Sequence, residues 1–384
     1  MNILLTGFSF TTLGGLEIVS AAIAQSLAES GHHVRCAAIH GHGVTDAGTY
    51  LVEGLLPAQR IFRSILHRSG LSNSAPGRLR EMVAWADAII ACHCHTLPLV
   101  FKAAQGAAGT APVVAWLHGR EVWGGMGRDF AASLRQADRL VAVSHYTSET
   151  VTQLLGDAFR PLVIHNPIDT ESFQPVATPA AIDRNTVLTV GRHDADTQHK
   201  GYDTLVEATG LLRKRSPGLP LRLRVAGDGT RLQALKESAA RHGVADRVDF
   251  LGAVSKSRLR ELYAGSDLFA FPSRVVHDGD DVYGEGFGVV NIEAAACGRP
   301  IVTSTHGGCP ETIRHGVTGL VVNPDSVAAV ADGIERLLLL DPKERDAMGA
   351  RGRQFVLDHF SNAILSRKLA DLLDSLPSRG RRSS

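Results

Sequence analysis

Short apolar runs of strand length alternate with amphipathic segments of helix length along this chain, and that alternation constrains its fold more than any other feature. The first series starts with ILLTG at residue 3 and continues through HVRCAAI, ADAIIAC, APVVAWLHG, DRLVAVS and PLVIHN. Strands that alternate with helices predict a parallel sheet covered by helices on both faces. The series lapses over residues 165–185, which are rich in Pro, Asp, Thr and Asn, and restarts at TVLTVGR. The pattern therefore predicts an α/β protein with two Rossmann-like, doubly wound domains.

The length of the chain supports this division. At 384 residues it exceeds the roughly 250–300 residues at which a single hydrophobic core stops growing. We expect a first domain over residues 1–170, a second over 171–358, and a C-terminal helix within 359–384 that packs back on the first domain and ends in a basic tail. Two such domains, facing each other across a cleft, bind ligands at the carboxyl ends of their strands. Residues that follow strands are therefore the first candidates for function.

Composition and charge exclude several classes of protein. Hydrophobic residues make up 44% of the chain and charged residues 21%, and no run approaches the roughly 20 apolar residues that span a bilayer. The 40 basic residues nearly balance the 39 acidic ones, so the sequence predicts no nucleic-acid partner. The opening segment MNILLTGFSF has no charged leader, and the five cysteines are scattered. We therefore expect a cytoplasmic protein.

The tetrad Cys92-His93-Cys94-His95 carries the residue types of a metal site. Because it continues the apolar run ADAIIAC, we interpret it as the end of a strand. Successive side chains of a strand point to opposite faces, so these four side chains are not expected to converge on one ion. The sequence therefore predicts packing here rather than metal binding.

The strongest chemical signal is the segment EGFGVVNIE from Glu285 to Glu293, which follows the apolar run DLFAFPS and enters a predicted helix. Its phosphate-binding candidates are Gly286, Phe287, Gly288 and Val289. Glycines at the start of a helix expose backbone N–H groups, and the helix dipole favours a phosphate there. Glu285 is placed to accept hydrogen bonds from sugar hydroxyls, and Glu293 to accept both hydroxyls of a ribose. A glycine-rich helix cap with two surface glutamates is the alternative interpretation.

Two cations follow the first strand of the second domain. Arg192 comes after TVLTVG and Lys200 opens the following helix, so both lie at one rim of the sheet and suit a diphosphate. Solvated surface positions are the alternative for both residues. Turn signals at the ends of the next two strands outline the rest of a nucleotide pocket: Gly227, Asp228 and the segment 250–252.

In the first domain, two further motifs follow strands. Gly14 and Gly15 close the loop after the first strand, where backbone N–H groups face a phosphate. His118 ends the run APVVAWLH. Core packing explains a histidine at a strand end as well as catalysis does, so the residues alone leave both interpretations open.

Together and in this order, the motifs GG, HG, GR…KG, GDG, FLG and E-x7-E resemble those of the family 4 retaining glycosyltransferases (glycosyl transferases group 1), which have the GT-B fold. The resemblance covers essentially the whole chain, and it implies that the first domain binds the acceptor and the second binds the nucleotide sugar. It implies that Arg192 and Lys200 hold the diphosphate of a nucleotide-sugar donor and that Glu293 binds its ribose. It also implies that Glu285 contacts the donor sugar and that Val254 contacts the base through its backbone.

The same resemblance implies an activity. It places His118 beside the donor sugar near the reacting carbon, so the implied catalytic set is His118, Arg192, Lys200 and Glu285. The reaction implied is transfer of a hexose, with retention, to a glycan, lipid-linked or small-molecule acceptor, as in cell-surface polysaccharide or glycolipid synthesis. The stretch between Arg192 and Lys200 is longer than the family's usual turn. Similar long turns occur in members resembling GDP-mannose-dependent mannosyltransferases, so GDP-mannose is favoured over a UDP-sugar.

Neither a cofactor nor a metal ion is expected. Asp194, Asp196 and the acidic segment 277–286 resemble the paired carboxylates that hold a divalent ion in another glycosyltransferase fold, but Arg192 and Lys200 already neutralise a diphosphate here. We expect these acidic loops to act as lids or acceptor contacts. Three other functions stay open: a glycoside hydrolase that pairs the two glutamates of E-x7-E, a nucleotide-sugar epimerase of similar architecture, and a non-catalytic nucleotide-sugar-binding subunit.

The segment 57–82 places basic residues among apolar ones in the first domain. Its arginines are Arg60, Arg63, Arg68, Arg78 and Arg80. In a helix, Ile61, Ile65 and Leu66 would share one face with arginines around it. Such a pattern suits peripheral contact with an anionic bilayer at the inner face of a membrane. An ordinary amphipathic helix that covers the sheet is the other interpretation.

Overall fold

The chain forms two compact units in the computed structural model, which describes residues 1–10, 15–40, 43–56, 77–106, 111–175 and 185–378. Unit 1 comprises Met1–Pro167 and Asn362–Ser384, and unit 2 comprises Ile168–Ser361. These limits lie a few residues from the expected boundaries at 170 and 358. The reason is a bridge between Ile168 and Ser361, the two ends of unit 2, which ties them to the same unit.

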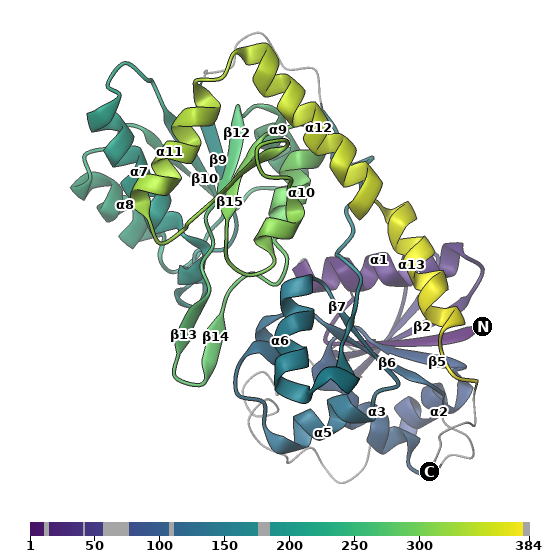
Figure 1. Cartoon of the computed structure of the whole chain (residues 1–384). Coiled ribbons are helices and arrows are strands. Elements are labelled where there is room, and N and C mark those ends of the chain that lie inside the picture. Colours follow the sequence, from purple (N-terminus) through teal and green to yellow (C-terminus); the bar gives the residue numbers. More distant parts are fainter. Residues whose placement is uncertain (11–14, 41–42, 57–76, 107–110, 176–184, 379–384) are drawn as a thin grey trace. The chain divides into compact units, whose positions relative to one another are not determined.

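Unit 1 contains an eight-stranded sheet with the order β3-β4-β2-β1-β5-β6-β7-β8 (Figure 1). Its strands are β1 (Asn2–Gly7), β2 (His33–His40), β3 (Gly43–Asp46), β4 (Leu51–Leu56), β5 (Ala88–Ala91), β6 (Val113–Leu117), β7 (Arg139–Ala142) and β8 (Leu162–Val163). All neighbouring pairs are parallel except β3 and β4. Every residue of β5 and β6 is buried, as the apolar runs predict for strands covered on both faces.

The structure describes seven α-helices in unit 1. They are α1 (Gly15–Glu29), α2 (Gly77–Trp85), α3 (Leu97–Ala104), α4 (Arg120–Trp123), α5 (Arg128–Gln136), α6 (His145–Leu155) and α13 (Asn362–Asp374), with 3-10 turns at Cys94–Thr96 and Asp157–Phe159. Helix α1 packs on α13, while α3 packs on α2 and α5 (Figure 1). The C-terminal helix α13 thus belongs to unit 1, where it buries Leu365, Leu369, Leu372 and Leu373.

Two features of unit 1 differ from the sequence interpretation. The edge pair β3 and β4 was not predicted, because Glu53 and Gly54 interrupt the apolar pattern of β4; Glu53 is buried and bonds Arg78. The interpretation of Cys92–His95 as strand is wrong. Strand β5 ends at Ala91, and Cys94 begins a 3-10 turn. Cys92 and Cys94 are nevertheless buried while both histidines are half-buried, so the cysteines and histidines do point to different environments.

Unit 2 contains a six-stranded parallel sheet with the order β11-β10-β9-β12-β15-β16. Its strands are β9 (Thr186–Val190), β10 (Arg222–Ala226), β11 (Val248–Gly252), β12 (Leu268–Phe271), β15 (Ile301–Ser304) and β16 (Gly319–Val322). Its α-helices are α7 (Tyr202–Arg215), α8 (Leu232–Arg241), α9 (Lys256–Ala264), α10 (Val289–Ala296), α11 (Val327–Leu338) and α12 (Pro342–Phe360), with 3-10 turns at Ala195–Lys200 and Cys309–Thr312.

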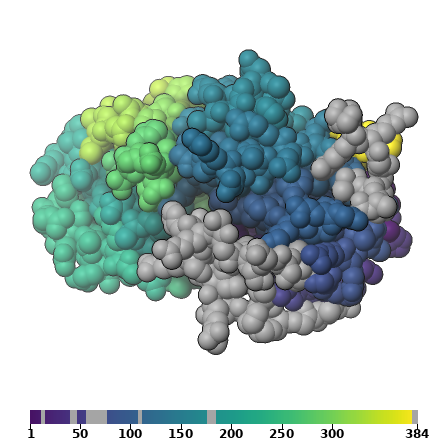
Figure 2. All heavy atoms as spheres, turned by 90° about the horizontal axis from the view of Figure 1, so that it is seen from below, coloured from purple at the N-terminus to yellow at the C-terminus, as the bar shows by residue number. Residues whose placement is uncertain are grey.

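The core of unit 2 lies between this sheet and helices α7 and α11. Val187, Val225 and Val302 from the strands meet Leu205 from α7 and Ile334 from α11, and all five are buried. In Figure 2, where all heavy atoms are drawn as spheres, the green atoms belong to this unit. A small hairpin of β13 (Val276–Asp278) and β14 (Asp281–Tyr283) lies outside the sheet, in the acidic segment interpreted as a loop.

The basic segment 57–82 is described only in part. Residues 57–76, which include Arg60, Arg63 and Arg68, lie outside the described residues. Arg78 and Arg80 lie on α2, where Arg78 donates to both carboxylate oxygens of Glu53 at 2.7 and 2.8 Å. Among the described residues, no helix combines the length and the apolar character that crossing a membrane requires.

Candidate functional site

The candidate donor residues of unit 2 gather at the carboxyl ends of its strands. Gly191 and Arg192 follow β9, Gly227 and Asp228 follow β10, and Val254 follows β11. In a parallel sheet these ends share one edge, the edge at which ligands bind. Asp228 is exposed, and its Oδ1 accepts a hydrogen bond from the N–H of Gly229 at 2.8 Å. Some polar groups of the loops at this edge therefore form hydrogen bonds within their own loop.

Lys200 and Glu285 form the closest ion pair at this edge. Lys200 Nζ lies 2.5 Å from Glu285 Oε1, and His199 Nε2 lies 3.6 Å from the same oxygen. The Lys200 and Glu285 side chains are 18% and 20% exposed. Burial by itself would raise the pKa of Glu285, but Lys200 and His199 outweigh it and hold that pKa at about 2. Glu285 is therefore an ionised carboxylate at neutral pH.

The loop that carries Glu285 packs on a second glycine pair, Gly307 and Gly308. The N–H of Gly308 donates to the carbonyl of Glu285 at 3.0 Å. A Cβ on Gly308 would overlap the carbonyl oxygen of Gly286, so only glycine permits this approach. Gly308 lies in the segment HGGCPETI, residues 306–313, and no local pattern indicated its contact with Gly286. In the structure this glycine supports the Glu285–Gly288 loop.

Helix α10 starts directly after that loop. Gly288 caps it with φ of 90°, a left-handed conformation that favours glycine, and Val289 is its first residue. Because α10 follows a loop at the carboxyl edge of the sheet, we expect the free N–H groups of its first turn to lie at that edge, where a phosphate would bind. The side chain of Phe287, in contrast, is buried and its ring lies 5.3 Å from that of Phe360. A ligand therefore meets the backbone of Phe287 and not its ring.

Glu293 lies one turn into α10 in an environment unlike that of Glu285. Its Oε2 accepts a hydrogen bond of 2.7 Å from the hydroxyl of Tyr263, which is fully buried on α9. Burial raises the pKa of Glu293 to about 7, although Tyr263 and Lys256 act to lower it. Tyr263 was not singled out in the sequence, because nothing local links it to a residue thirty positions away.

Arg192 is more exposed than Lys200 and pairs with a different carboxylate. Its side chain is 70% exposed, and its Nη1 bonds Asp194 Oδ2 at 3.0 Å. The other oxygen of Asp194 accepts the N–H of Thr230 at 3.2 Å. The long segment before Lys200 is a 3-10 turn rather than an open loop, and the hydroxyl of Thr197 bonds the carbonyl of Arg192 at 3.0 Å. This turn determines where Lys200 points.

His118 follows β6 at the carboxyl edge of the unit 1 sheet. Its Nε2 lies 2.7 Å from the carbonyl oxygen of Cys92, and its backbone N–H donates to Glu121 Oε1 at 2.5 Å. A carbonyl only accepts, so Nε2 carries the proton and, in the neutral ring, Nδ1 keeps a lone pair. Nδ1 is buried and has no partner among the described residues. Gly15 begins α1, whereas Gly14 lies outside the described residues.

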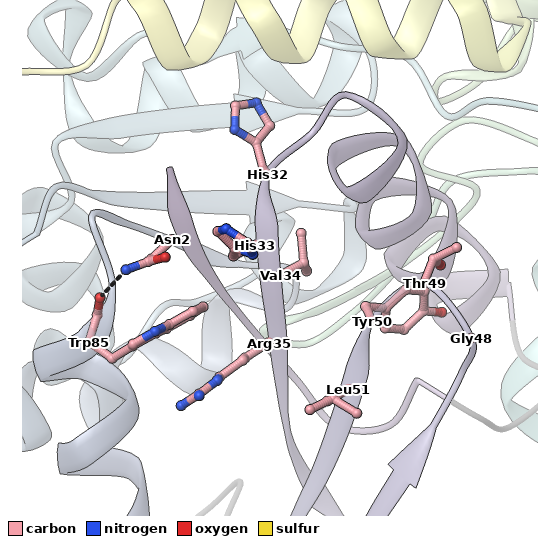
Figure 3. A pocket seen from close by; sticks show the side chains of 10 residues that line it. All are labelled: Asn2, His32, His33, Val34, Arg35, Gly48, Thr49, Tyr50, Leu51 and Trp85. Carbon is pink, nitrogen blue, oxygen red and sulfur yellow. Dashed lines mark hydrogen bonds between the residues drawn. The ribbon is translucent and has the colours of Figure 1, made fainter.

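A hollow of about 590 Å³ lies elsewhere in unit 1, at the amino ends of β1, β2 and β4. Figure 3 shows Arg35 from β2 beside the ring of Trp85, with its guanidinium carbon 4.3 Å from the ring centroid. Doubly wound sheets bind their ligands at the carboxyl edge, and this hollow lies at the opposite edge of the unit 1 sheet.

Known proteins resemble the chain over nearly its whole length. The model of Glycosyltransferase Family 4 matches residues 13–172, and that of Glycosyl transferases group 1 matches 172–355. The GDP-mannose-dependent alpha-(1-6)-phosphatidylinositol monomannoside mannosyltransferase of Mycobacterium tuberculosis is 35% identical over 330 residues, which cover 81% of this chain and 83% of that protein. The D-inositol 3-phosphate glycosyltransferase of Salinispora tropica is 33% identical over 261 residues, 62% of this chain and 50% of that protein.

Solved structures agree with the fold. Sucrose-phosphate synthase from Thermosynechococcus elongatus is similar with a TM-score of 0.76 at 21% identity, covering 97% of this chain and 98% of that one. The relatives identify the enzyme as a transferase, so the hydrolase, epimerase and binding-subunit alternatives lose their support. With both family models, its relatives and its fold in agreement, the chain belongs to the family 4 glycosyltransferases and has the GT-B fold.

Proposed function

We propose that this glycosyltransferase moves a mannosyl group from GDP-mannose to a hydroxyl of a glycan or lipid-linked acceptor, with retention of configuration. The observation that carries the proposal is the 2.5 Å contact between Lys200 Nζ and Glu285 Oε1 at the carboxyl edge of unit 2. It joins a cation suited to a leaving diphosphate to a carboxylate suited to sugar hydroxyls. The GDP-mannose dependence in the name of the M. tuberculosis relative supports the choice of donor.

In the proposed reaction, the bond between the anomeric carbon and the diphosphate oxygen breaks, and the acceptor oxygen bonds that carbon from the same face. The proton of the acceptor hydroxyl passes to the departing diphosphate. Lys200, Arg192 and the N–H groups of Gly286 to Gly288 stabilise the charge that develops on the diphosphate, usually the largest contribution at such sites. Lys200 and His199 keep Glu285 ionised, so it accepts hydrogen bonds from the donor sugar.

The remaining donor contacts follow from position. Glu293 accepts the ribose hydroxyls through the carboxylate that Tyr263 orients. Val254, in the loop between β11 and α9, meets the base through its backbone, and Gly227 with Asp228 borders the nucleotide. In unit 1, His118 contacts the donor sugar near the reacting carbon. Gly15, the first residue of α1, contributes its N–H group, and the N–H group of Gly14 has the same proposed role.

The proposal includes catalysis without a metal ion. Both carboxylate oxygens of Asp194 already have partners, Arg192 and the N–H of Thr230. Asp278 and Asp281 are paired residues of the β13–β14 hairpin. We expect EDTA to leave transfer unchanged. Complete loss, restored by Mn²⁺ or Mg²⁺, would assign Asp194, Asp196 or the hairpin carboxylates to a metal site.

A donor screen followed by product analysis tests the proposal. GDP-mannose should raise the melting temperature more than UDP-glucose, and transfer to octyl α-D-mannopyranoside should give an α-mannoside by NMR. A β-mannoside product would exclude retention, and selective stabilisation by UDP-glucose would exclude the donor. Release of mannose from p-nitrophenyl α-mannoside without nucleotide would instead indicate a hydrolase.

A further inference from the structure

We propose that four aromatic rings at the carboxyl edge of unit 1 form the acceptor subsite, and that this subsite binds an uncharged, polyhydroxylated six-membered ring. The rings belong to Phe8, His93, His95 and Phe130, and we call them the ring row. The inference rests on the proposed function, because it names the class of acceptor that the enzyme takes. It concerns residues that neither the donor site nor the role of His118 uses.

The four rings follow one another in contact. The ring of Phe8 lies 4.2 Å from that of His93, the ring of His93 is stacked 5.2 Å from that of His95, and the ring of His95 lies 4.6 Å from that of Phe130. They come from three places in the chain: the end of β1, the segment after β5, and α5. The centroid of His93 is 6.3 Å from that of His118. The row therefore borders the position assigned to the reacting sugar.

The ring row is neither part of the core nor fully solvated. All four residues are half-buried, whereas the two cysteines between and beside the histidines are fully buried. No described residue forms a hydrogen bond with a ring nitrogen of His95, and the buried Nδ1 of His93 is also without a partner. A row of rings with unused polar atoms suits a ligand that is apolar on its faces and polar at its rim.

A sugar or cyclitol ring has this character, because C–H groups occupy its faces and hydroxyls its rim. Imidazole offers both a flat surface for the C–H face and a nitrogen for a hydroxyl. Burial lowers the pKa of His93 and of His95, so both rings are neutral at physiological pH. The charge that acts on His95 is the carboxylate of Glu121. A neutral row beside a carboxylate disfavours a phosphate, which prefers cations.

The ring row therefore predicts where a charged acceptor group does not bind. If the natural acceptor carries a phosphate or a lipid, the ring that receives the sugar still packs on the row as an uncharged ring. The neutral ring row differs in this respect from the hollow at the amino ends of β1 and β2, where Arg35 supplies a positive charge.

Steady-state kinetics with a matched pair of acceptors test this inference. With GDP-mannose as donor, the probes are methyl α-D-mannopyranoside and its 6-phosphate. His95→Ala and Phe130→Ala should each raise KM for the neutral probe about tenfold, the loss of roughly 1.4 kcal/mol expected for an aromatic contact, while kcat changes by less than about twofold. His95→Phe should keep part of the affinity, since it preserves the ring. His95→Arg should favour the phosphate-bearing probe.

The control is His33→Ala, which removes an exposed histidine from the amino end of β2 in the same unit and should change nothing. Binding of GDP-mannose and its slow hydrolysis without acceptor should be unchanged in every variant. An unchanged KM in both His95→Ala and Phe130→Ala, or a wild-type preference for the 6-phosphate, would overturn the ring row while leaving the donor chemistry intact.

Saturation-transfer NMR keeps the two proposals separable. Signals of methyl α-D-mannopyranoside should appear with the wild type and weaken with His95→Ala, whether or not the enzyme uses GDP-mannose. If GDP-mannose neither binds nor reacts, the proposed function fails, and NMR signals that His95→Ala weakens still support the ring row. If GDP-mannose binds but the neutral probe gives neither transfer nor NMR signals, only the ring row fails.

Discussion

Glu285 and Glu293 both belong to the proposed donor site, yet their carboxyl groups have very different pKa values. The pKa of Glu285 is about 2 because Lys200 and His199 overcome the effect of burial, whereas burial raises that of Glu293 to about 7. An ionised carboxylate accepts two hydroxyl hydrogen bonds, and a protonated one accepts fewer. Protonation of Glu293 therefore competes with binding of the donor ribose.

We predict that GDP-mannose binds about tenfold more weakly at pH 6 than at pH 8, since only the ionised fraction of Glu293 is competent to bind. Calorimetric titration without acceptor measures this dependence. Tyr263→Phe removes a hydrogen bond that lowers the pKa, so the midpoint should move to higher pH. Glu293→Gln should bind weakly at every pH. A wild-type profile that is flat from pH 6 to pH 8 would contradict the assignment of Glu293.

Lys200→Ala should lower turnover on the order of 10²- to 10³-fold, because it removes a preorganised charge from the leaving diphosphate. It also leaves Glu285 without its closest cation, so the pKa of Glu285 should rise. In the wild type, Glu285 stabilises the fold above pH 4.5, and this contribution is lost as the pH falls from 4.5 towards 2. Denaturant unfolding across that range should show a shallower loss for Lys200→Ala.

Arg258→Ala is the control for that prediction, since it removes an exposed cation of unit 2 that pairs with its helix neighbour Glu261. It should leave turnover and acid stability unchanged. Arg192→Ala should reduce turnover with less effect on stability, because its side chain is 70% exposed. Near-normal turnover in both Lys200→Ala and Arg192→Ala would exclude this edge as the diphosphate site.

At the scale of elements, the Glu285–Gly288 loop packs on a second loop, which follows β15. Gly308, in the turn after β15, donates its N–H to Glu285 and lies against the carbonyl of Gly286. The two loops together set the position at which α10 starts. The positions of the N–H groups in its first turn therefore depend on the absence of a side chain at Gly308.

Gly308→Ala should lower stability by about 1–3 kcal/mol and turnover by more than tenfold, because the new Cβ displaces the Glu285–Gly288 loop. Melting temperature and donor titration measure both effects. Gly218→Ala is the matched control. Among the described residues no atom beyond its chain neighbours lies within 4 Å of the Cβ position, so the variant should resemble the wild type. Normal donor affinity in Gly308→Ala would show that the loop does not depend on this support.

At the scale of the whole molecule, the arginines of segment 57–82 have two possible partners. Arg78 already pairs with Glu53 within unit 1, which accords with a helix that covers the sheet. Arg60, Arg63 and Arg68 lie outside the described residues, and the sequence pattern suits either an anionic membrane or the sheet as their partner.

We predict co-sedimentation with phosphatidylserine-containing liposomes at low salt and release at high salt. Replacing Arg60, Arg63 and Arg68 by Ser should weaken binding roughly 100-fold, since each basic residue near such a surface contributes about 1 kcal/mol. The same replacement at Arg160, Arg241 and Arg258 controls for net charge. Binding that is absent, or equal in the two triple variants, would favour a soluble acceptor.

The sequence by itself determined the architecture and the order of the motifs. Alternating strand and helix patterns depend on neighbours a few residues apart. The parallel strands of both sheets, the lapse before Thr186, and the glycines and cations after β9 and before α10 were therefore predictable, whereas the antiparallel edge pair β3 and β4 was not. The resemblance to family 4 followed from those same local motifs, and the family models and relatives confirm it.

The tertiary structure alone decided which side chains meet and with what charge. No local pattern links Tyr263 to Glu293, Gly308 to Gly286, or Phe8 to the histidines after β5. The tetrad Cys92–His95 was misjudged for the same reason, because the end of β5 depends on its neighbours in the sheet rather than on its own residues. Contacts between distant residues come from packing, and packing also sets the burial that separates the pKa of Glu285 from that of Glu293.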